Sequence, residues 1–337
     1  MPRLRRVDCS EPGIRRIRRG AGFSYEEEDG TRVEDAETLD RIRELAIPPA
    51  WKDVWVCPFP NGHIQATGYD DAGRKQYLYH EGWRAKRDRE KFADMERFAR
   101  ALPRMRRRTD DDLAKRGLVR DRVLACAVRL LDLGFFRIGS ERYAEQNETF
   151  GLATLRRSHV RIERGAAVFD YRAKNSKRHR QTIADPAVVP TIRALRNRRG
   201  GGQDLLAYRR GRGWANMRAD EINEYLKAVM GGDWSAKDFR TWNATVLTAV
   251  ELARNGNGAG TKTARRRIAN EATKRVADYL SNTPAVCRSS YIDPRVFDRF
   301  DSGETIRRAL ERIVDGSGPD EFPDRERIER AVLRLIA

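Results

Sequence analysis

Four short segments of the chain carry side chains suited to phosphodiester chemistry. They are Phe136–Gly139 with Arg137, Ala173–His179 with Lys174, Lys237–Trp242 with Arg240, and Asn282–Tyr291, which ends in a tyrosine. Metal-free transfer of a phosphodiester needs a nucleophile, cationic donors for the added charge, and an acid for the leaving oxygen. Arginine suits the second task, because its planar guanidinium matches phosphate oxygens and keeps its charge. The chain has 68 lysines and arginines, so spacing must identify the reactive ones.

Each of these residues also has a purely structural interpretation when it is taken alone. Arg137 could cap the carbonyl end of a helix, and Lys174 could be an ordinary turn residue. Arg240 could be a surface charge on a helix, and Tyr291 a core aromatic. Taken one at a time, the two interpretations stay open, and the resemblance of the whole set to a known family, given next, favours the chemical one.

Taken in order, the four segments resemble the motifs of type IB DNA topoisomerases of the poxvirus and bacterial kind. Phe136-Arg137-Ile138-Gly139, with Tyr143 six residues after the arginine, resembles the first arginine motif of that family. Ala173–His179 resembles its catalytic-lysine hairpin, Lys237–Trp242 its second arginine motif, and Asn282–Tyr291 its terminal motif. The resemblance runs in order from about residue 15 to residue 300.

The resemblance implies a role for each residue. Tyr291 would be the nucleophile, forming a 3′-phosphotyrosyl bond and a free 5′-hydroxyl. Arg137 and Arg240 would hold the phosphate oxygens, and Lys174 would protonate the 5′ oxygen. Such an enzyme relaxes supercoiled duplex DNA as a monomer, with no cofactor, no ATP and no required metal.

Contacts with DNA are implied in both halves of the chain. The segment Gly73–His80 resembles the family's major-groove segment, so we expect Gln76, Tyr77 and Tyr79 to contact DNA. The alternative is a half-buried strand, in which alternating aromatics are common. Tyr143 and Lys237 are expected to contact DNA in the second half.

Asn282 departs from the pattern, because the family often has histidine at this place and no other histidine is near in sequence. A side-chain amide donates a neutral hydrogen bond to a non-bridging phosphate oxygen, but it does not titrate near neutral pH. We therefore expect Asn282 to act only through that hydrogen bond.

The overall charge agrees with a nucleic-acid partner. Sixty-eight basic residues against 50 acidic ones give a net charge of +18, which is typical of proteins that bind polyanions. No run of about 18 apolar residues predicts a membrane span, and no signal peptide is evident. We expect a cytoplasmic, nucleoid-associated protein. Two alternatives stay open, namely a tyrosine site-specific recombinase and a non-catalytic basic architectural DNA-binding protein.

Other motifs carry little chemistry. The four cysteines form no C-x-x-C pair and lie at no zinc spacing with the four histidines, so we expect reduced, structural thiols and no metal site. The glycine-rich stretch 256–263 lacks the Gly-Lys of a phosphate-binding loop and follows a predicted helix. It is interpreted as a loop between helices.

The first part of the chain predicts a small β-rich domain at 1–85. Residues 1–35 are polar, and a helix is expected after Asp35 or Thr38, ending at Pro48-Pro49. Residues 51–57 predict a strand, and 64–69 with 75–80 a β-hairpin around the Asp71-Ala72-Gly73 turn.

The rest of the chain, 86–337, predicts a larger, mainly α-helical catalytic domain, with the charged stretch 81–91 as a hinge. Helical periodicity predicts helices at 186–198, 218–229, 236–254, 261–280 and 324–336. Short strands at 159–163, 168–173 and 178–183 interrupt them, and the last two form the hairpin that carries Lys174. The expected fold class is therefore α+β, and by resemblance the two domains would clamp the duplex.

Overall fold

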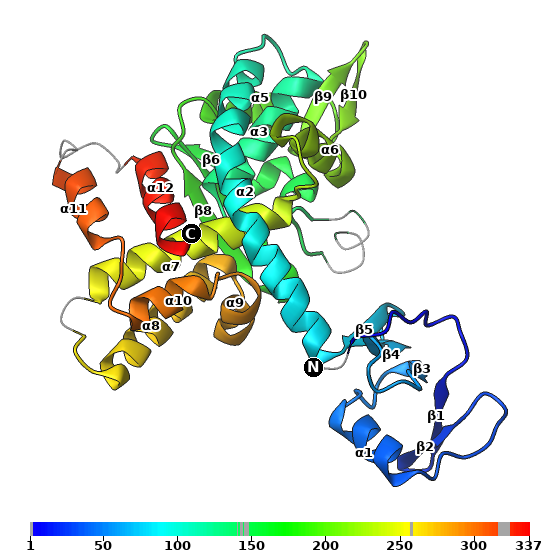
Figure 1. Cartoon of the computed structure of the whole chain (residues 1–337). Helices are drawn as coiled ribbons and strands as arrows, with labels where there is room; N and C mark the ends of the chain where they lie inside the picture. The colour runs from blue at the N-terminus through cyan, green and yellow to red at the C-terminus, as the bar shows by residue number, and fades with distance from the viewer. Residues whose placement is uncertain (1–2, 140, 142–143, 145–147, 257–258, 316–323) are drawn as a thin grey trace. The chain divides into compact units, whose positions relative to one another are not determined.

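The structure is a computed structural model that describes residues 3–139, 141, 144, 148–256, 259–315 and 324–337 (Figure 1). The chain forms two compact units, Met1–Lys91 and Phe92–Ala337. The first contains a β-sheet and the second is mainly helical with smaller sheets. This arrangement confirms the predicted α+β fold class.

The first unit is an antiparallel sheet of five strands with one helix. The sheet order is β2-β1-β3-β4-β5. The strands are β1 (Ile14–Arg19), β2 (Gly22–Glu26), β3 (Lys52–Val56), β4 (Ile64–Tyr69) and β5 (Lys75–Tyr79), and the helix is α1 (Ala36–Glu44). Asp35 caps α1 by accepting a hydrogen bond from Thr38 N at 2.8 Å, as the helix-start pattern predicts. A small core around Ile14, Ile42 and Val56 joins the helix to the sheet.

Strands β1 and β2 were not predicted from the sequence. Arginines fill four of the six positions of β1, which hides the apolar alternation. Arg16 nevertheless packs its stem inward, because its Nη2 donates to the carbonyl of Trp51 at 2.6 Å and its guanidinium lies 4.2 Å from the ring centroid of Phe23. Long cationic side chains cover apolar surface in this way while their charged ends find polar partners.

Helix α2 (Glu81–Leu113) continues from the first unit into the second. The stretch 81–91, expected as a hinge, is therefore helical here rather than an irregular linker. From Arg84 to Glu90 its side chains are exposed. Beyond Lys91 the helix buries Phe92, Met95 and Phe98 in the large core.

The second unit is built mainly from helices. They are α3 (Arg120–Leu133), α5 (Val189–Asn197), α6 (Ala219–Met230), α7 (Ala236–Asn255), α8 (Lys262–Leu280), α9 (Pro284–Ser290), α10 (Arg295–Asp301), α11 (Arg307–Asp315) and α12 (Arg325–Ile336). Of these, α5, α6, α7, α8 and α12 follow the predicted ranges closely, whereas α9, α10 and α11 were not predicted. Phe98, Phe239 and Trp242 are among the largest fully buried side chains of its core. The glycine-rich stretch after residue 255 lies between α7 and α8 and follows a helix, so it does not match a phosphate-binding loop.

Two small antiparallel sheets accompany these helices. Strands β6 (Val160–Glu163), β7 (Ala166–Arg172) and β8 (Arg178–Ile183) form one in that order. Strands β9 (Ala207–Arg210) and β10 (Gly213–Asn216) form the other, which sequence analysis did not predict. The β7–β8 turn contains the short 3-10 helix Lys174–Ser176, so Lys174 lies at the tip of a hairpin as predicted.

Candidate active site

Arg137 is positioned by the segment that follows α3. Gly134 ends the helix, and Phe136 is fully buried, with its ring 5.0 Å from that of Phe169. The carbonyl of Arg137 accepts a hydrogen bond from Leu152 N at 2.8 Å. The backbone around Arg137 is therefore held in place, and its guanidinium is half-buried.

The glycine at position 139 of this motif is required for steric reasons. Gly139 has φ +81°, a conformation that L side chains rarely adopt, and its backbone lies against that of Gly151. A Cβ on Gly139 would lie 2.8 Å from the Cα of Gly151, and one on Gly151 would lie 2.5 Å from the Cα of Gly139. Only glycine at both places allows this close approach.

Arg240 connects the other segments of the site. It lies near the start of α7, is only 3 % exposed, and donates through Nη1 to the carbonyl of Phe135 and through Nη2 to that of Leu280 at 2.9 Å. Phe135 is two residues before Arg137, and Leu280 is two residues before Asn282. Its side chain thus holds three motif segments together.

Asn282 lies against Arg137, directly after the end of α8. Its Oδ1 accepts a hydrogen bond from Arg137 Nη2 at 2.5 Å, and the same nitrogen lies 3.3 Å from the carbonyl of Ser281. The Nδ2 of Asn282 is buried, and within the described residues it has no hydrogen-bond partner. One amide atom is therefore used within the protein, while the other is a donor available for a ligand.

Tyr291 directly follows α9. Its backbone N–H donates to the carbonyl of Cys287 at 3.0 Å, and its own carbonyl lies 3.5 Å from Thr245 Oγ1. Its ring centroid is 5.2 Å from the Cζ of Arg240, so the tyrosine and the second arginine are in contact. The structure therefore brings Arg137, Arg240, Asn282 and Tyr291 together.

Lys174 does not join this group in the structure. Its side chain is exposed at the hairpin tip, and no contact described for the chain links it to the other four residues. The hairpin base is fixed, because Ala173 N donates to the carbonyl of Lys177 at 2.7 Å.

His179 was missed by sequence reasoning. It is 8 % exposed, its Nδ1 lies 3.3 Å from Ser281 Oγ, and its Nε2 lies 3.3 Å from Gln181 Oε1. Asn282 is the next residue after Ser281, so a histidine does lie near the site in space, although 102 positions separate it from Ser281. Only its place five residues after Lys174 in the same motif could have drawn attention to it.

The site carries two positive charges that are poorly hydrated. Burial, together with the neighbouring charge of Arg137, lowers the pKa of Arg240 to about 10. Burial also lowers the pKa of Arg137. Both groups keep their protons at neutral pH, and the buried Arg240 Nε has no hydrogen-bond partner in the described parts of the chain. Two close guanidiniums with an unused donor fit an oxyanion, which would satisfy the donor and offset the repulsion.

A pocket of 490 Å³ lies beside these groups. Arg178, Arg180, His179, Tyr279 and Ser281 are among the residues that line it. Tyr279 is 56 % exposed, and its ring lies 5.8 Å from that of Phe135. The pocket therefore gives the site a basic and aromatic border.

The residues expected to contact DNA differ in exposure and lie on different faces. Lys237 is exposed in the first turn of α7, whereas Tyr143 lies outside the described residues. In the first unit, the exposed rings of Tyr77 and Tyr79 stack at 6.0 Å on one face of β5. Gln76 lies on the opposite face, and its Nε2 donates to Asp70 Oδ2 at 2.9 Å. These three residues therefore do not form one surface.

Two further observations concern other kinds of site. Among the described residues, the histidine, cysteine, aspartate and glutamate side chains form no group of three or more that could hold a metal ion. None of the helices described is long and apolar enough to cross a membrane. Cys57, Cys126 and Cys287 are buried free thiols and Cys9 is half-buried.

Comparison with known proteins identifies the class to which this fold and site belong. Residues 80–313 match the family model of the eukaryotic DNA topoisomerase I catalytic core, and residues 22–70 match that of the bacterial DNA topoisomerase IB N-terminal domain. The chain is thus an enzyme of the DNA topoisomerase class, an isomerase.

Individual relatives narrow the assignment. The chain is 32 % identical to DNA topoisomerase 1B of Acanthamoeba polyphaga mimivirus over 288 residues, covering 83 % of this chain and 85 % of that protein. It is 22 % identical to DNA topoisomerase 1 of Rabbit fibroma virus over 82 % of this chain and 88 % of that protein. DNA topoisomerase 1 of Schizosaccharomyces pombe is 31 % identical over 41 % of this chain and 16 % of that longer protein. The chain belongs to the type IB DNA topoisomerase family, with the N-terminal domain of the bacterial kind.

Proposed function

We propose that this protein relaxes supercoiled duplex DNA through a transient 3′-phosphotyrosyl bond to Tyr291. Tyr291 Oη attacks the scissile phosphorus, and the bond from phosphorus to the 5′ oxygen breaks. Religation by the free 5′-hydroxyl reverses these steps. Because the ester conserves the energy of the broken bond, the cycle needs no ATP. The two arginines take the charge-stabilising role of a metal ion, so no metal is required.

One observation carries the proposal. Two buried donors, Arg240 Nε and Asn282 Nδ2, have no hydrogen-bond partner within the described residues. Arg240 lies beside the Tyr291 ring, and Asn282 contacts the half-buried Arg137. Donors held in place before the reaction stabilise the charge that develops on phosphate oxygens. We assign Arg137, Arg240 and Asn282 to that task.

Lys174 is the proposed general acid for the 5′ oxygen. Its exposed position on a hairpin tip supports a side chain that meets the leaving group when DNA is bound, since catalytic contacts often form only in the complex. Lys237 of α7 and the tyrosines of β5 are the proposed DNA contacts. The net charge of +18 supports duplex DNA as the partner, and we infer a monomer that works at the bacterial nucleoid in the cytoplasm.

The decisive test is the Tyr291→Phe variant with supercoiled plasmid. It should bind DNA nearly normally, yet relax none and form no covalent adduct after denaturant trapping. Mass mapping should place the parent's adduct on Tyr291. An adduct that persists in the variant would move the nucleophile to another tyrosine, with Tyr279 of the neighbouring pocket as the first candidate.

Two controls separate this function from its alternatives. Relaxation should proceed in EDTA without nucleotide, and complete dependence on Mg²⁺ would contradict the mechanism. Stepwise relaxation of single plasmids by a monomer is expected, whereas a recombinase would pair specific sites and an architectural protein would bind DNA without any adduct.

A further inference from the structure

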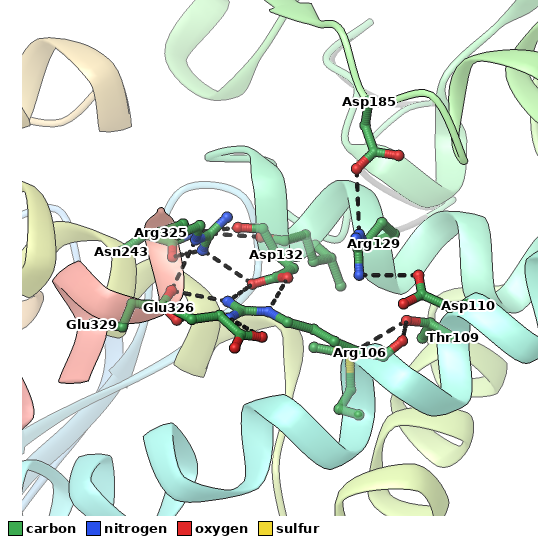
Figure 2. A network of polar contacts seen from close by, with 12 residues as sticks. Arg106, Thr109, Asp110, Arg129, Asp132, Asp185, Asn243, Arg325, Glu326 and Glu329 are labelled. Carbon is green, nitrogen blue, oxygen red and sulfur yellow. Dashed lines mark hydrogen bonds and ion pairs between the residues drawn. The ribbon is translucent and has the colours of Figure 1, made fainter. Parts of the chain in front are cut away.

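A buried network of charges joins α12 to the rest of the second unit (Figure 2). We call Arg106, Asp132, Asn243, Arg325 and Glu329 the α12 network. Arg106 donates to Asp132 Oδ2 at 2.9 Å and to Glu329 Oε2 at 2.7 Å. Arg325 donates to Asp132 Oδ1 at 3.0 Å and to Glu329 Oε1 at 2.8 Å. Two guanidiniums thus alternate with two carboxylates.

Three of the four charged members of the network are hidden from water. The side chains of Asp132, Glu329 and Arg106 are 2 %, 8 % and 9 % exposed. Buried ions are tolerated only with good geometry and complete pairing, and removing one partner leaves an uncompensated charge. The pairing therefore restrains these three side chains, and Arg325, which is 34 % exposed, completes the pairing of both carboxylates.

Two members of the network lie within five residues, in sequence, of the arginines proposed to hold the phosphate. Asp132 is in the last turn of α3, five residues before Arg137, and Asn243 is on α7, three residues after Arg240. The Nη2 of Arg325 donates to both, at 3.0 Å to Asp132 Oδ1 and at 2.9 Å to Asn243 Oδ1. One side chain of α12 therefore connects the two segments that carry Arg137 and Arg240.

Asn243 transmits this connection to the backbone that precedes Arg137. Its Nδ2 lies 3.1 Å from the carbonyl of Asp132 and 3.3 Å from that of Gly134. Because Arg325 binds the Oδ1 atom, the amide is oriented with Nδ2 toward these carbonyls. Loss of Arg325 would leave Asn243 Oδ1 without this donor and Asp132 with one guanidinium fewer.

The network also crosses a boundary seen in the family comparison. The match to the catalytic core ends at residue 313, whereas α12 begins at Arg325. Arg106, Asp132 and Asn243 lie inside the matched segment. A helix beyond that segment is therefore tied to the residues that flank the site.

We propose that Arg325 is a positioning residue for DNA cleavage, acting through Asp132 and Asn243 to set the relative placement of Arg137 and Arg240. This inference rests on the proposed function, in which both arginines hold the scissile phosphate. α12 itself touches neither the DNA nor the reacting atoms in this account. Small errors in the placement of reacting groups are costly, at about 10²-fold in rate for about 1 Å.

The test compares Arg325→Gln with the matched control Lys115→Gln. Lys115 is 38 % exposed and pairs with Asp112, a carboxylate that is 1 % exposed, at 2.7 Å, while Arg325 is 34 % exposed and its partner Asp132 is 2 % exposed. Asp112 also binds Tyr225 at 2.7 Å and lies away from the catalytic segments in sequence. Both substitutions remove a cation from a buried carboxylate and should lower the unfolding midpoint.

Single-turnover cleavage of a duplex oligonucleotide, at saturating enzyme and at a temperature where both variants are folded, separates them. Arg325→Gln should cleave about 10- to 100-fold more slowly than the parent, with its DNA affinity nearly unchanged. Lys115→Gln should cleave at the parent rate. In an Arg240→Lys background, adding Arg325→Gln should cost much less than it does alone, because residues that act as a unit are not additive.

Three outcomes would overturn the proposal. They are parent-like cleavage by Arg325→Gln, an equal loss in Lys115→Gln, and full additivity with Arg240→Lys. If Arg325→Gln does not fold, Arg325→Lys, which keeps the charge but not the forked contact, should still show the slower cleavage. A parent that forms no adduct contradicts the proposed function itself, and this inference with it.

Discussion

At the scale of single residues, Asn282 uses its two amide atoms for different purposes. Oδ1 accepts from Arg137, which leaves the buried Nδ2 as the proposed donor to phosphate. Asn282→Ala should cost about 1.5–3 kcal/mol of transition-state stabilisation, the scale of a hydrogen bond to a charged group. That is about 10- to 150-fold in single-turnover cleavage.

Two substitutions at this residue sharpen the measurement. Asn282→Asp keeps an acceptor for Arg137 but replaces the donor with a negative charge, so it should cleave more slowly than Asn282→Ala. Asn282→His should keep substantial activity and gain a rate dependence near pH 6.5, where imidazole titrates. Parent-like cleavage by Asn282→Ala would show that the amide lies off the phosphate.

The proposed role of Lys174 as an acid can be tested with a modified DNA substrate. Lys174→Ala should slow cleavage by about 10²–10⁴-fold, the usual contribution of a positioned proton donor. A 5′-bridging sulfur at the scissile phosphate leaves without much protonation, so on that substrate the defect should largely vanish. An unchanged defect would mean that Lys174 acts by charge or position, and Arg137 would become the better candidate for the acid.

The lowered pKa of His179 predicts how the free energy of unfolding responds to mild acid. Burial and the charges of Arg240 and Arg137 lower its pKa, despite the opposing hydrogen bond to Gln181. The folded protein therefore binds this proton less readily than the unfolded chain, so stability is lost as pH falls below about 6.5. Urea unfolding from about pH 5 to about pH 7.5 should show a shallower slope for His179→Gln than for the parent. Equal slopes would mean that His179 is protonated with little cost.

At the scale of elements, strand β5 divides the expected DNA contacts between two faces. Tyr77 and Tyr79 are 39 % and 37 % exposed and stacked together, whereas Gln76 is held by Asp70 on the other face. Tyr77→Ala should weaken duplex binding by about tenfold, or about 1.4 kcal/mol, as truncation of a contact tyrosine does. Gln76→Ala is the matched control on the same strand and should bind DNA like the parent. A larger loss with Gln76→Ala would place the opposite face of β5 on the DNA.

Elements with a clear hydrophobic period were predictable from the sequence. Helix α7 was expected at 236–254 and runs from Ala236 to Asn255, because its apolar residues recur at helical spacing over five turns. Strands β1 and β2 were not, since arginines fill four of the six positions of β1 and β2 is a short strand in a polar stretch. The motif spacing identified Arg137, Arg240, Asn282 and Tyr291, which do converge. The contact of His179 with Ser281 and that of Arg325 with Asp132 join positions 102 and 193 residues apart, and such pairs leave no local pattern.

At the scale of the whole molecule, the positive charge is distributed unequally between the two units. The excess of 18 positive charges attracts DNA of any sequence and should make affinity fall steeply with salt. The four convergent residues all belong to the second unit, whereas β5 belongs to the first. The first unit is nearly neutral, with 18 lysines and arginines against 17 acidic residues, so the positive excess and the proposed chemistry both belong to the second unit.

The continuous helix α2 has a consequence for the susceptibility of the chain to proteases. Between Arg84 and Glu90 its side chains are exposed, and the pairs of Glu90 with Lys86 at 3.9 Å and Arg87 at 3.4 Å are its described side-chain ties. Such surface pairs contribute only about 0.3–0.5 kcal/mol each, so this stretch should open locally far more often than either folded unit unfolds. Brief trypsin treatment should cut first at its many basic residues and release two resistant fragments. Alanine in place of Glu90 should speed that cut, and bound duplex should slow it if DNA contacts both units at once.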